Sequence, residues 1–432
     1  MKKLLAILLA AAMVLSLGAT AVFADDVSYE VTEPIEIVWW HALEDQYTPL
    51  VNEIVEAFNA SQDLITVTAQ YIGSYTEVNE ALVSANAAGS GLPAVVVANT
   101  PYVAQYGASG LYEDLGPYIE ATGYDVSDFS TGLLISSQYE GKQVALPFLH
   151  STQVIYYNKT IADKYGIEVP DSMTYEQFKA FAEAGKAALE QEGAEEAYGA
   201  VFGGWDQWYY ETLYLNQGVE IITEDGTTDL DSDKAIAVTE FIKGMVDDGT
   251  SYLAYGSGAS ANMRQKFYDQ NAFCVMHTSS LYNTYVSNCP DFEVGMIWFP
   301  TGDDGTHNSE VGGCVLGIPS ANDQATKNAA WVFLQYLCGK EVNMKWAEGT
   351  GYIPTRNSVL TTDEGVAFLE AKPAFQCIFD NLNLINPRIQ DAHWSELANI
   401  WMDYMNRMIN EGDDIASSSA DMAEEINEIL AE

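Results

Sequence analysis

The sequence predicts an α/β protein of two lobes, each built on a mostly parallel sheet flanked by helices. The chain has 432 residues, which is too long for one compact core. Its first part alternates short apolar runs with helical patterns, the arrangement typical of a parallel sheet. Two later extended runs, within 140–166 and at 311–320, are candidate crossings between lobes. These observations together predict discontinuous lobes joined by two hinge crossings.

Residues 1–24 have the pattern of a signal peptide. Lys2 and Lys3 give a positive start, an apolar stretch follows over 4–17, and small residues end at Ala24 before Asp25. The apolar stretch is short for a membrane span of about 20 residues, so a retained anchor is the weaker alternative. We therefore expect an exported protein on the periplasmic or extracellular face of the cell membrane. No cysteine lies near the cleavage site, so retention by a lipid anchor is not expected.

Strands and helices alternate from residue 35 to residue 99. Strands are expected at 35–40, 64–72 and 93–99, and helices at 47–58 and 74–89. Ser74 is the expected N-cap of the second helix, and Glu77 stands three residues later, as in a capping box. This order predicts a parallel, doubly wound sheet, in which ligands gather at the carboxyl ends of the strands.

Aromatic and polar residues stand at these three strand ends, as Trp40–His41, Gly73–Tyr75 and Asn99–Thr100. We expect Trp39 or Trp40 to pack the first strand into its lobe. His41 and Glu44 should then lie at the lip of a cleft, where they could contact a polar ligand. Ordinary core positions for the tryptophans, and a catalytic base at His41, are the alternatives.

Helical patterns dominate the rest of the chain. They cover 174–191, 206–217, 232–248, 260–270, 327–339, 340–351 and much of 391–432. A buried strand is expected at 292–300. With the two crossings, this order predicts an N-terminal lobe of residues 33–150 and 315–352. The C-terminal lobe then comprises 151–314 and 353–432.

Charge and cysteine content exclude several classes of partner. The formal net charge is −44, which argues against nucleic acid or an anionic membrane surface as a nonspecific partner. The five cysteines are odd in number and contain no CxxC, so their spacing is unlike a zinc site. One disulfide with three free thiols, or five free thiols, are the alternatives. No metal or cofactor is expected.

The sequence contains none of the common catalytic motifs, but it concentrates aromatic residues in the stretch 202–218. The sequence has no GxSxG, HExxH, Gly-rich phosphate loop or GxGxxG after a strand. A carboxylate pair for glycoside hydrolysis stays an alternative, because 62 acidic residues offer many pairs. The stretch FGGWDQWYYETLYLNQG at 202–218 places Trp205 and Trp208 near a helix start. Flat rings there could stack on a polyol or a cation, or could simply be helix core.

Several stretches together resemble the extracellular solute-binding proteins of ABC importers, a family that binds sugars and related compounds. They are IEIVWWHALED, GSYTEVNEALVSANAAGSGLPAVVVAN, ALPFLHSTQVIYYNKTIADKYGIEVPDSMTYEQFKAFAE, VGGCVLGIPS and WAEGTGYIPTR. The resemblance covers nearly the whole mature chain. It implies a periplasmic-binding-protein fold and a monomer that captures a solute without catalysis. The partner would be the membrane permease.

Within that family, several motifs are similar to those of sn-glycerol-3-phosphate and glycerophosphodiester binders. These proteins hold phosphate with hydroxyls, a backbone amide, a tyrosine and an arginine. The positions that match are Ser151, Ser279 or Ser280, Gly312 or Gly313, Tyr352 and Arg388, with Trp205 or Trp208 as the stacking ring. The Arg388 guanidinium fork would take two phosphate oxygens. The alternative for Arg388 is a structural salt bridge with one of the many carboxylates.

The chain departs from those binders at Leu149-His150, where they have small polar residues. A neutral oligosaccharide would use the same rings, with Glu44, Glu77 and Asp206 accepting from its hydroxyls. We therefore expect a sugar or oligosaccharide ligand, with a glycerol-phosphate compound second and an exported glycosidase as a remote alternative. The predicted ligand contacts are Trp40, His41, Glu44, Tyr75, Glu77, Asn99, Ser151, Trp205, Trp208, Ser279, Gly312, Gly313, Tyr352 and Arg388.

Overall fold

The computed structural model describes residues 28–43 and 47–431. The signal peptide predicted for residues 1–24 and the predicted ligand contact Glu44 lie outside the described residues. Val31–Glu432 forms one compact unit. Within the described part of the chain, no helix combines the length and apolar character needed to cross a bilayer.

The first three strands form the parallel sheet that the sequence predicts. They are β1 (Ile35–His41), β2 (Ile65–Tyr71) and β3 (Val95–Asn99), and β1 pairs in parallel with both of the others. The intervening helices are α2 (Thr48–Ser61) and α3 (Tyr75–Ala88). The predicted capping box at the start of α3 is confirmed, because Ser74 Oγ accepts from the Glu77 amide and the Glu77 carboxylate accepts from the Ser74 amide.

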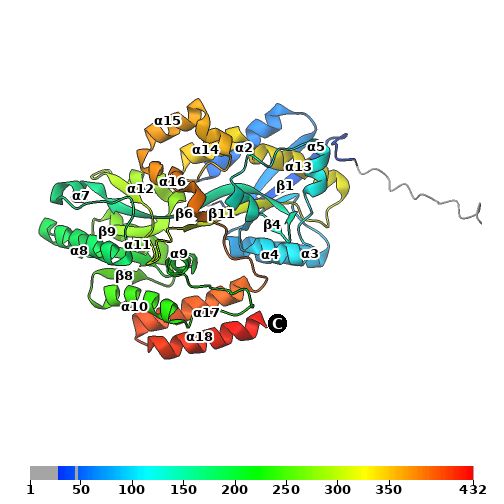
Figure 1. Ribbon diagram of the computed structural model, residues 1–432. Coiled ribbons are helices and arrows are strands. Elements are labelled where there is room, and N and C mark those ends of the chain that lie inside the picture. The colour runs from blue at the N-terminus through cyan, green and yellow to red at the C-terminus, as the bar shows by residue number, and fades with distance from the viewer. Residues whose placement is uncertain (1–27, 44–46, 432) are drawn as a thin grey trace, which may run out of the picture. The chain divides into compact units, whose positions relative to one another are not determined.

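Two long strands lie in the middle of the sheet, at the positions expected for the crossings. β6 (Ala145–Asn158) is buried along its whole length, and β11 (Ser309–Gly317) runs antiparallel beside it. β11 also pairs with β3, whereas the second half of β6 pairs with β9 (Ala272–Thr278) and β10 (Val294–Ile297). The strand order is therefore β2-β1-β3-β11-β6-β9-β7-β8, one continuous sheet in which β6 pairs with strands of both halves. Figure 1 shows β6 and β11 together in the middle of the molecule.

The second half of the sheet again contains parallel strands covered by helices. β7 (Tyr198–Gly203) pairs in parallel with β8 (Ser251–Ala254) and with β9. The larger helices of this half are α8 (Tyr175–Glu192), α9 (Trp208–Asn216), α10 (Asp233–Asp247), α11 (Ala259–Tyr268), α17 (Trp394–Asn406) and α18 (Ile415–Leu430). Side chains of α8, α9, α10, α17 and α18 share one buried apolar cluster with β7 and β9.

Two helices follow β11 and return the chain to the first half. They are α13 (Gln324–Leu337) and α14 (Lys340–Gly349), and Phe333 of α13 packs edge-on against Trp39 of β1 with ring centroids 5.7 Å apart. α14 ends at Gly349, two residues before the end of the helical pattern at 340–351. The remaining elements are α4 (Tyr102–Ala108), α5 (Gly116–Thr122), α6 (Thr131–Ile135), β4 (Gln138–Tyr139), β5 (Lys142–Gln143), α7 (Lys159–Tyr165), α12 (Tyr282–Asn288), α15 (Asp363–Ala371), α16 (Gln376–Phe379) and β12 (Ile385–Asn386).

All five cysteines are free thiols, which decides between the two alternatives left by the sequence. In the described residues, no three His, Cys, Asp or Glu side chains gather as a metal site would require. The division into lobes at the residues given above stays a prediction.

Candidate functional site

A pocket of about 360 Å³ lies at the carboxyl ends of the parallel strands. Tyr75 follows β2 and Asn99 ends β3, while Trp205 follows β7 and His277 lies near the end of β9. Ser151 contributes from the middle of β6. Helices begin directly after several of these strands, so their first residues also face the pocket. The placement agrees with the expectation that ligands gather at these ends of a doubly wound sheet.

Two glycines of β11 let the backbone approach the pocket closely. Gly312 pairs with Ser151 across the strands. A Cβ on Gly312 would lie 2.6 Å from Trp208 Cζ2 and 2.8 Å from Ser151 Oγ, so any larger residue would displace the ring. Gly313 has φ 93°, a conformation that side chains rarely adopt, and a Cβ there would strike the Leu149 carbonyl. Both predicted positions line the pocket, and both require glycine because a Cβ would clash there.

An aromatic wall of Trp205, Trp208, Tyr209 and His277 forms one side of the pocket. The ring centroids of Trp205 and Tyr209 are 4.6 Å apart, and Tyr209 stacks on His277 at 5.6 Å. Trp208 is buried, and its Nε1 has no hydrogen-bond partner among the described residues. The predicted tryptophans thus both reach the pocket, and one presents an unused donor.

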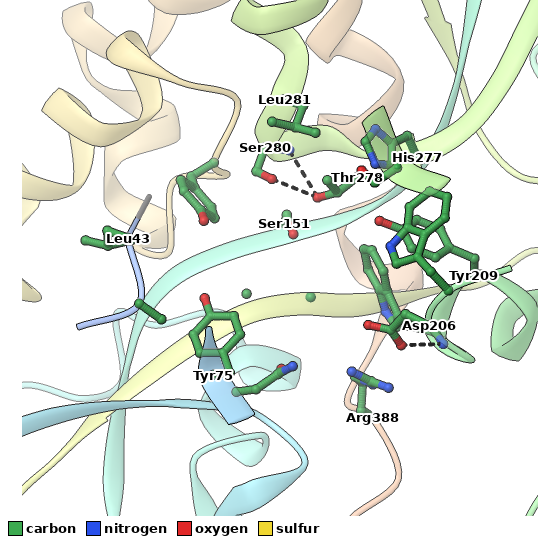
Figure 2. A pocket seen from close by; sticks show the side chains of 18 of the residues that line it. Leu43, Tyr75, Ser151, Asp206, Tyr209, His277, Thr278, Ser280, Leu281 and Arg388 are labelled. Carbon is green, nitrogen blue, oxygen red and sulfur yellow. Dashed lines mark hydrogen bonds between the residues drawn. The ribbon is translucent and has the colours of Figure 1, made fainter. Parts of the chain in front are cut away.

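Asp206 supplies a carboxylate at the end of this wall near Arg388 (Figure 2). Its Oδ1 accepts from the Trp208 backbone amide at 2.9 Å. Burial raises the pKa of Asp206, whereas the nearby Arg388 charge and the Trp208 amide oppose that rise. Across the pocket, Asn99 Oδ1 is buried without a partner in the described structure. The two side chains offer acceptors for ligand hydroxyls.

Arg388 lines the pocket, but its guanidinium fork is held by Glu211. Arg388 Nη2 donates to Glu211 Oε1 at 2.7 Å, and Nε donates to Oε2 at 3.3 Å. The two side chains are 3% and 0% exposed. When the Gln207 amide nitrogen faces Asp206, its oxygen accepts from Arg388 Nη2 at 2.7 Å. The structure therefore shows the salt bridge that the sequence left as the alternative for Arg388.

Glu310 lies in the same buried cluster as Arg388, Glu211 and Asp206. β12 pairs with β11 so that Glu310 lies opposite Asn386, two residues before Arg388. Both carboxyl oxygens of Glu310 are buried without a hydrogen-bond partner in the described part of the chain. Burial first, and the Glu211 charge second, raise the pKa of Glu310 well above its ordinary value. Burial and the neighbouring carboxylate therefore favour the protonated form of Glu310.

Replacing Glu310 by Gln is expected to stabilise the protein at higher pH. Because the folded-state pKa of Glu310 is raised, its bound proton favours folding fully below the unfolded value of 4.5. That contribution is lost as the pH rises through the folded value. Glu310→Gln does not titrate, so its advantage in urea unfolding should be near zero at about pH 4 and grow toward about pH 8. A variant less stable than wild type at the higher pH would contradict a raised pKa of Glu310 in the folded protein.

Several pocket residues were missed by the sequence analysis. They are Ala42, Leu43, Tyr47, Tyr209, Ser260, Arg264, His277, Thr278 and Leu281. The sequence predicts Asp206 only as an acceptor for the hydroxyls of a neutral oligosaccharide. His277 and Thr278 end a strand that the helical patterns around it concealed. Ser280 was an alternative to Ser279, and the hydroxyls of Thr278 and Ser280 lie 2.9 Å apart.

Four predicted contacts lie outside this pocket. Trp40 Nε1 donates to Gln70, and His41 is buried, with Nδ1 accepting from the Leu43 amide at 3.2 Å. β1 continues through His41, so Ala42 and Leu43 reach the pocket instead. Burial lowers the pKa of His41 to about 4. The remaining two contacts are exposed Glu77, which caps α3, and buried Ser279, whose hydroxyl accepts from the Thr152 amide.

A second pocket of about 350 Å³ adjoins the first. Both pockets are lined by Tyr75, Asn99, Trp205, Asp206 and Arg388. The second pocket adds Tyr102 of α4 together with Trp394 and Asn399 of α17. A ligand longer than one ring could therefore extend past Trp205.

The chain belongs to the family of bacterial extracellular solute-binding proteins, whose profile matches residues 53–376. It is a solute-binding protein of the kind that serves ABC transporters. The erythritol/L-threitol-binding protein of Mycolicibacterium smegmatis is 29% identical over 355 residues, covering 74% of this chain and 70% of that protein. The sn-glycerol-3-phosphate-binding periplasmic protein UgpB of Pectobacterium atrosepticum is 26% identical over 355 residues, covering 78% and 77%.

Solved structures show the same fold at lower sequence identity. UgpB from Mycobacterium tuberculosis in complex with glycerophosphocholine has a TM-score of 0.81 at 20% identity, covering 93% of this chain and 99% of that one. The GacH receptor of Streptomyces glaucescens, solved unliganded and with acarbose, has a TM-score of 0.79 at 20% identity and covers 93% and 100%. The predicted family and fold class are confirmed.

Proposed function

We propose that this protein captures a sugar or oligosaccharide in the pocket beside Trp205 and Asp206 and presents it to an ABC permease. The observation that carries the proposal is an aromatic wall beside polar groups that can bind a ligand, of which Trp208 Nε1 and Asn99 Oδ1 are buried without a partner among the described residues. Trp208 Nε1 can donate, whereas Asn99 Oδ1 and Asp206 can accept. A sugar presents an apolar ring face and a rim of hydroxyls, so it uses both kinds of group at once.

The size of the site supports a small ligand that consists of more than one sugar ring. Each of the two adjoining pockets, at about 360 and 350 Å³, falls in the range of small-molecule sites. Trp205 and Asp206 belong to both. We propose that a first sugar ring binds against the aromatic wall and that further rings extend toward Trp394.

A glycerol-phosphate compound is the second candidate, and the hydroxyls favour it. Tyr75, Ser151, Ser280 and Tyr352 line the same pocket as the Gly312–Gly313 backbone. Figure 2 shows Tyr75, Ser151 and Ser280 around the same open space. The salt bridge between Arg388 and Glu211 argues against phosphate binding by Arg388, because Glu211 already occupies the guanidinium fork.

We propose that the protein binds without turnover. Hydrolysis of a glycoside needs two carboxyl groups beside the bond that breaks. Among the described residues, Asp206 is the one carboxylate that lines either pocket. Burial lowers the pKa of His277 to about 3, so this ring is a weak base. We further propose an exported monomer whose lobes, divided at the predicted boundaries, close on the ligand.

Titration of the purified mature protein against neutral oligosaccharides, polyols and glycerol phosphates tests this function. A compound at 100 times its dissociation constant should add about 2.7 kcal/mol of stability. Trp205→Ala should weaken saccharide binding at least about tenfold, because it removes a stacking surface from both pockets. Trp40→Ala is the matched control, since Trp40 contacts Gln70 outside the pocket.

Three outcomes distinguish the candidates. Saccharide binding that Trp205→Ala weakens and Trp40→Ala spares supports the proposal. Exclusive binding of glycerol phosphates would favour the second candidate. Release of product from any bound compound at stoichiometric purity would contradict binding without turnover.

A further inference from the structure

Arg264 lies on the face of α11 that borders the pocket. Ser260, one helical turn earlier, lines the same pocket, so both side chains project from one side of the helix. The Arg264 side chain is neither fully buried nor fully exposed. Its charge reaches the neighbouring pocket residues, because it contributes to lowering the pKa of His277 and opposes the rise of the Tyr209 pKa.

Arg264 lacks the partners that other cations of this acidic protein have. Lys266, two residues later on α11, pairs with Glu196 at 2.5 Å. Arg356 and Lys372 donate to backbone carbonyls. Within the described part of the chain, Arg264 makes neither a hydrogen bond nor an ion pair.

The absence of a carboxylate partner is informative because acidic groups are abundant. The formal net charge is −44, with 62 acidic and 18 basic residues. Arg388, the other arginine that lines the pocket, is neutralised by Glu211 at 2.7 Å. Asp206 also lines the pocket, yet it does not pair with Arg264 in the described structure. The Arg264 guanidinium is therefore available to a ligand.

We propose that Arg264 binds an anionic oxygen group, a carboxylate or a phosphate, carried by the polyhydroxylated ligand. The inference rests on the proposed function and narrows its ligand to an acidic sugar or polyol derivative. The hydroxyls of Ser260, Thr278 and Ser280 line the same pocket and can donate to the same group. A guanidinium binds such oxygens through two parallel hydrogen bonds. It also offsets the repulsion that a strongly acidic protein exerts on an anion.

The test compares pairs of compounds that differ only in the anionic group. Suitable pairs are sorbitol and gluconate, glucose and glucose 6-phosphate, and glycerol and sn-glycerol 3-phosphate, each titrated calorimetrically. In the wild-type protein, the acidic member of at least one pair should bind more tightly. Arg264→Gln should lower the affinity for that member about tenfold to a hundredfold and leave the neutral member nearly unchanged. Added salt should weaken the acidic member more in the wild-type protein than in the variant.

Lys266→Gln is the matched control, because it removes one positive charge from the same helix outside the pocket. An equal effect of both variants would mean that only overall charge matters and would overturn the proposal. Equal wild-type affinity for both members of every pair that binds would overturn it while leaving the proposed function intact. If no sugar or polyol in the wider panel binds, the proposed function and this inference fall together.

Discussion

Replacing Glu211 by Ala is expected to destabilise the protein by about 3–5 kcal/mol. The substitution leaves the Arg388 guanidinium buried, with its 2.7 and 3.3 Å hydrogen bonds to Glu211 lost. The remaining groups beside Arg388 are Gln207, Asp206 and Glu310, and neither carboxyl group holds the guanidinium fork in two hydrogen bonds. Urea unfolding measures the change in free energy.

Two control variants show whether the loss of stability comes from leaving the Arg388 charge buried without its partner. Glu192→Gln breaks an exposed pair with Lys164 and should leave the unfolding midpoint nearly unchanged. The double variant Glu211→Met/Arg388→Met should recover much of the lost stability, because neither charge then stays buried alone. A Glu211→Ala protein as stable as wild type would contradict a structural role for this ion pair.

Replacing Asp206 by Asn is expected to weaken sugar or polyol binding by about tenfold to a hundredfold. The change removes a charged acceptor that lines both pockets and keeps the side-chain volume. Because burial raises the pKa of Asp206, the loss of its charge should cost the fold little. Calorimetric titration with the tightest ligand of the panel measures the affinity.

Glu77→Gln is the matched control for this carboxylate. The sequence analysis placed Glu77 among the ligand contacts, whereas the structure shows it as an exposed cap of α3. Gln also serves in a capping box, so both fold and binding should be retained. Weaker binding in Glu77→Gln but not in Asp206→Asn would contradict the assignment of the pocket.

Regular periodicity made most of the fold predictable. The alternation of strands and helices over 35–99 gave the parallel sheet, and Ser74 with Glu77 gave the start of α3. The extended runs within 140–166 and at 311–320 are β6 and β11. The sequence did not indicate that β6 pairs with strands of both halves of the sheet, because pairing partners far apart in the chain leave no local pattern.

The site was predictable only where a residue follows a strand end or belongs to a motif shared with the family. Asn99, Tyr75 and the glycines of β11 were found in this way. His41 lies outside the pocket because β1 runs one residue further than its apolar pattern suggests. The partner of Arg388 comes from a helix more than 170 positions away, so the sequence alone left its role open. Arg264 was missed because a helical arginine ordinarily faces solvent or a carboxylate.

A structure of the protein with its tightest-binding sugar or polyol tests the central claim most directly. We expect the ligand in the pocket of Figure 2, with a ring or carbon chain against Trp205 or Trp208 and a hydroxyl within hydrogen-bond distance of Asp206. Density for the ligand elsewhere on the protein, or in this pocket without contact to the aromatic wall, would contradict it.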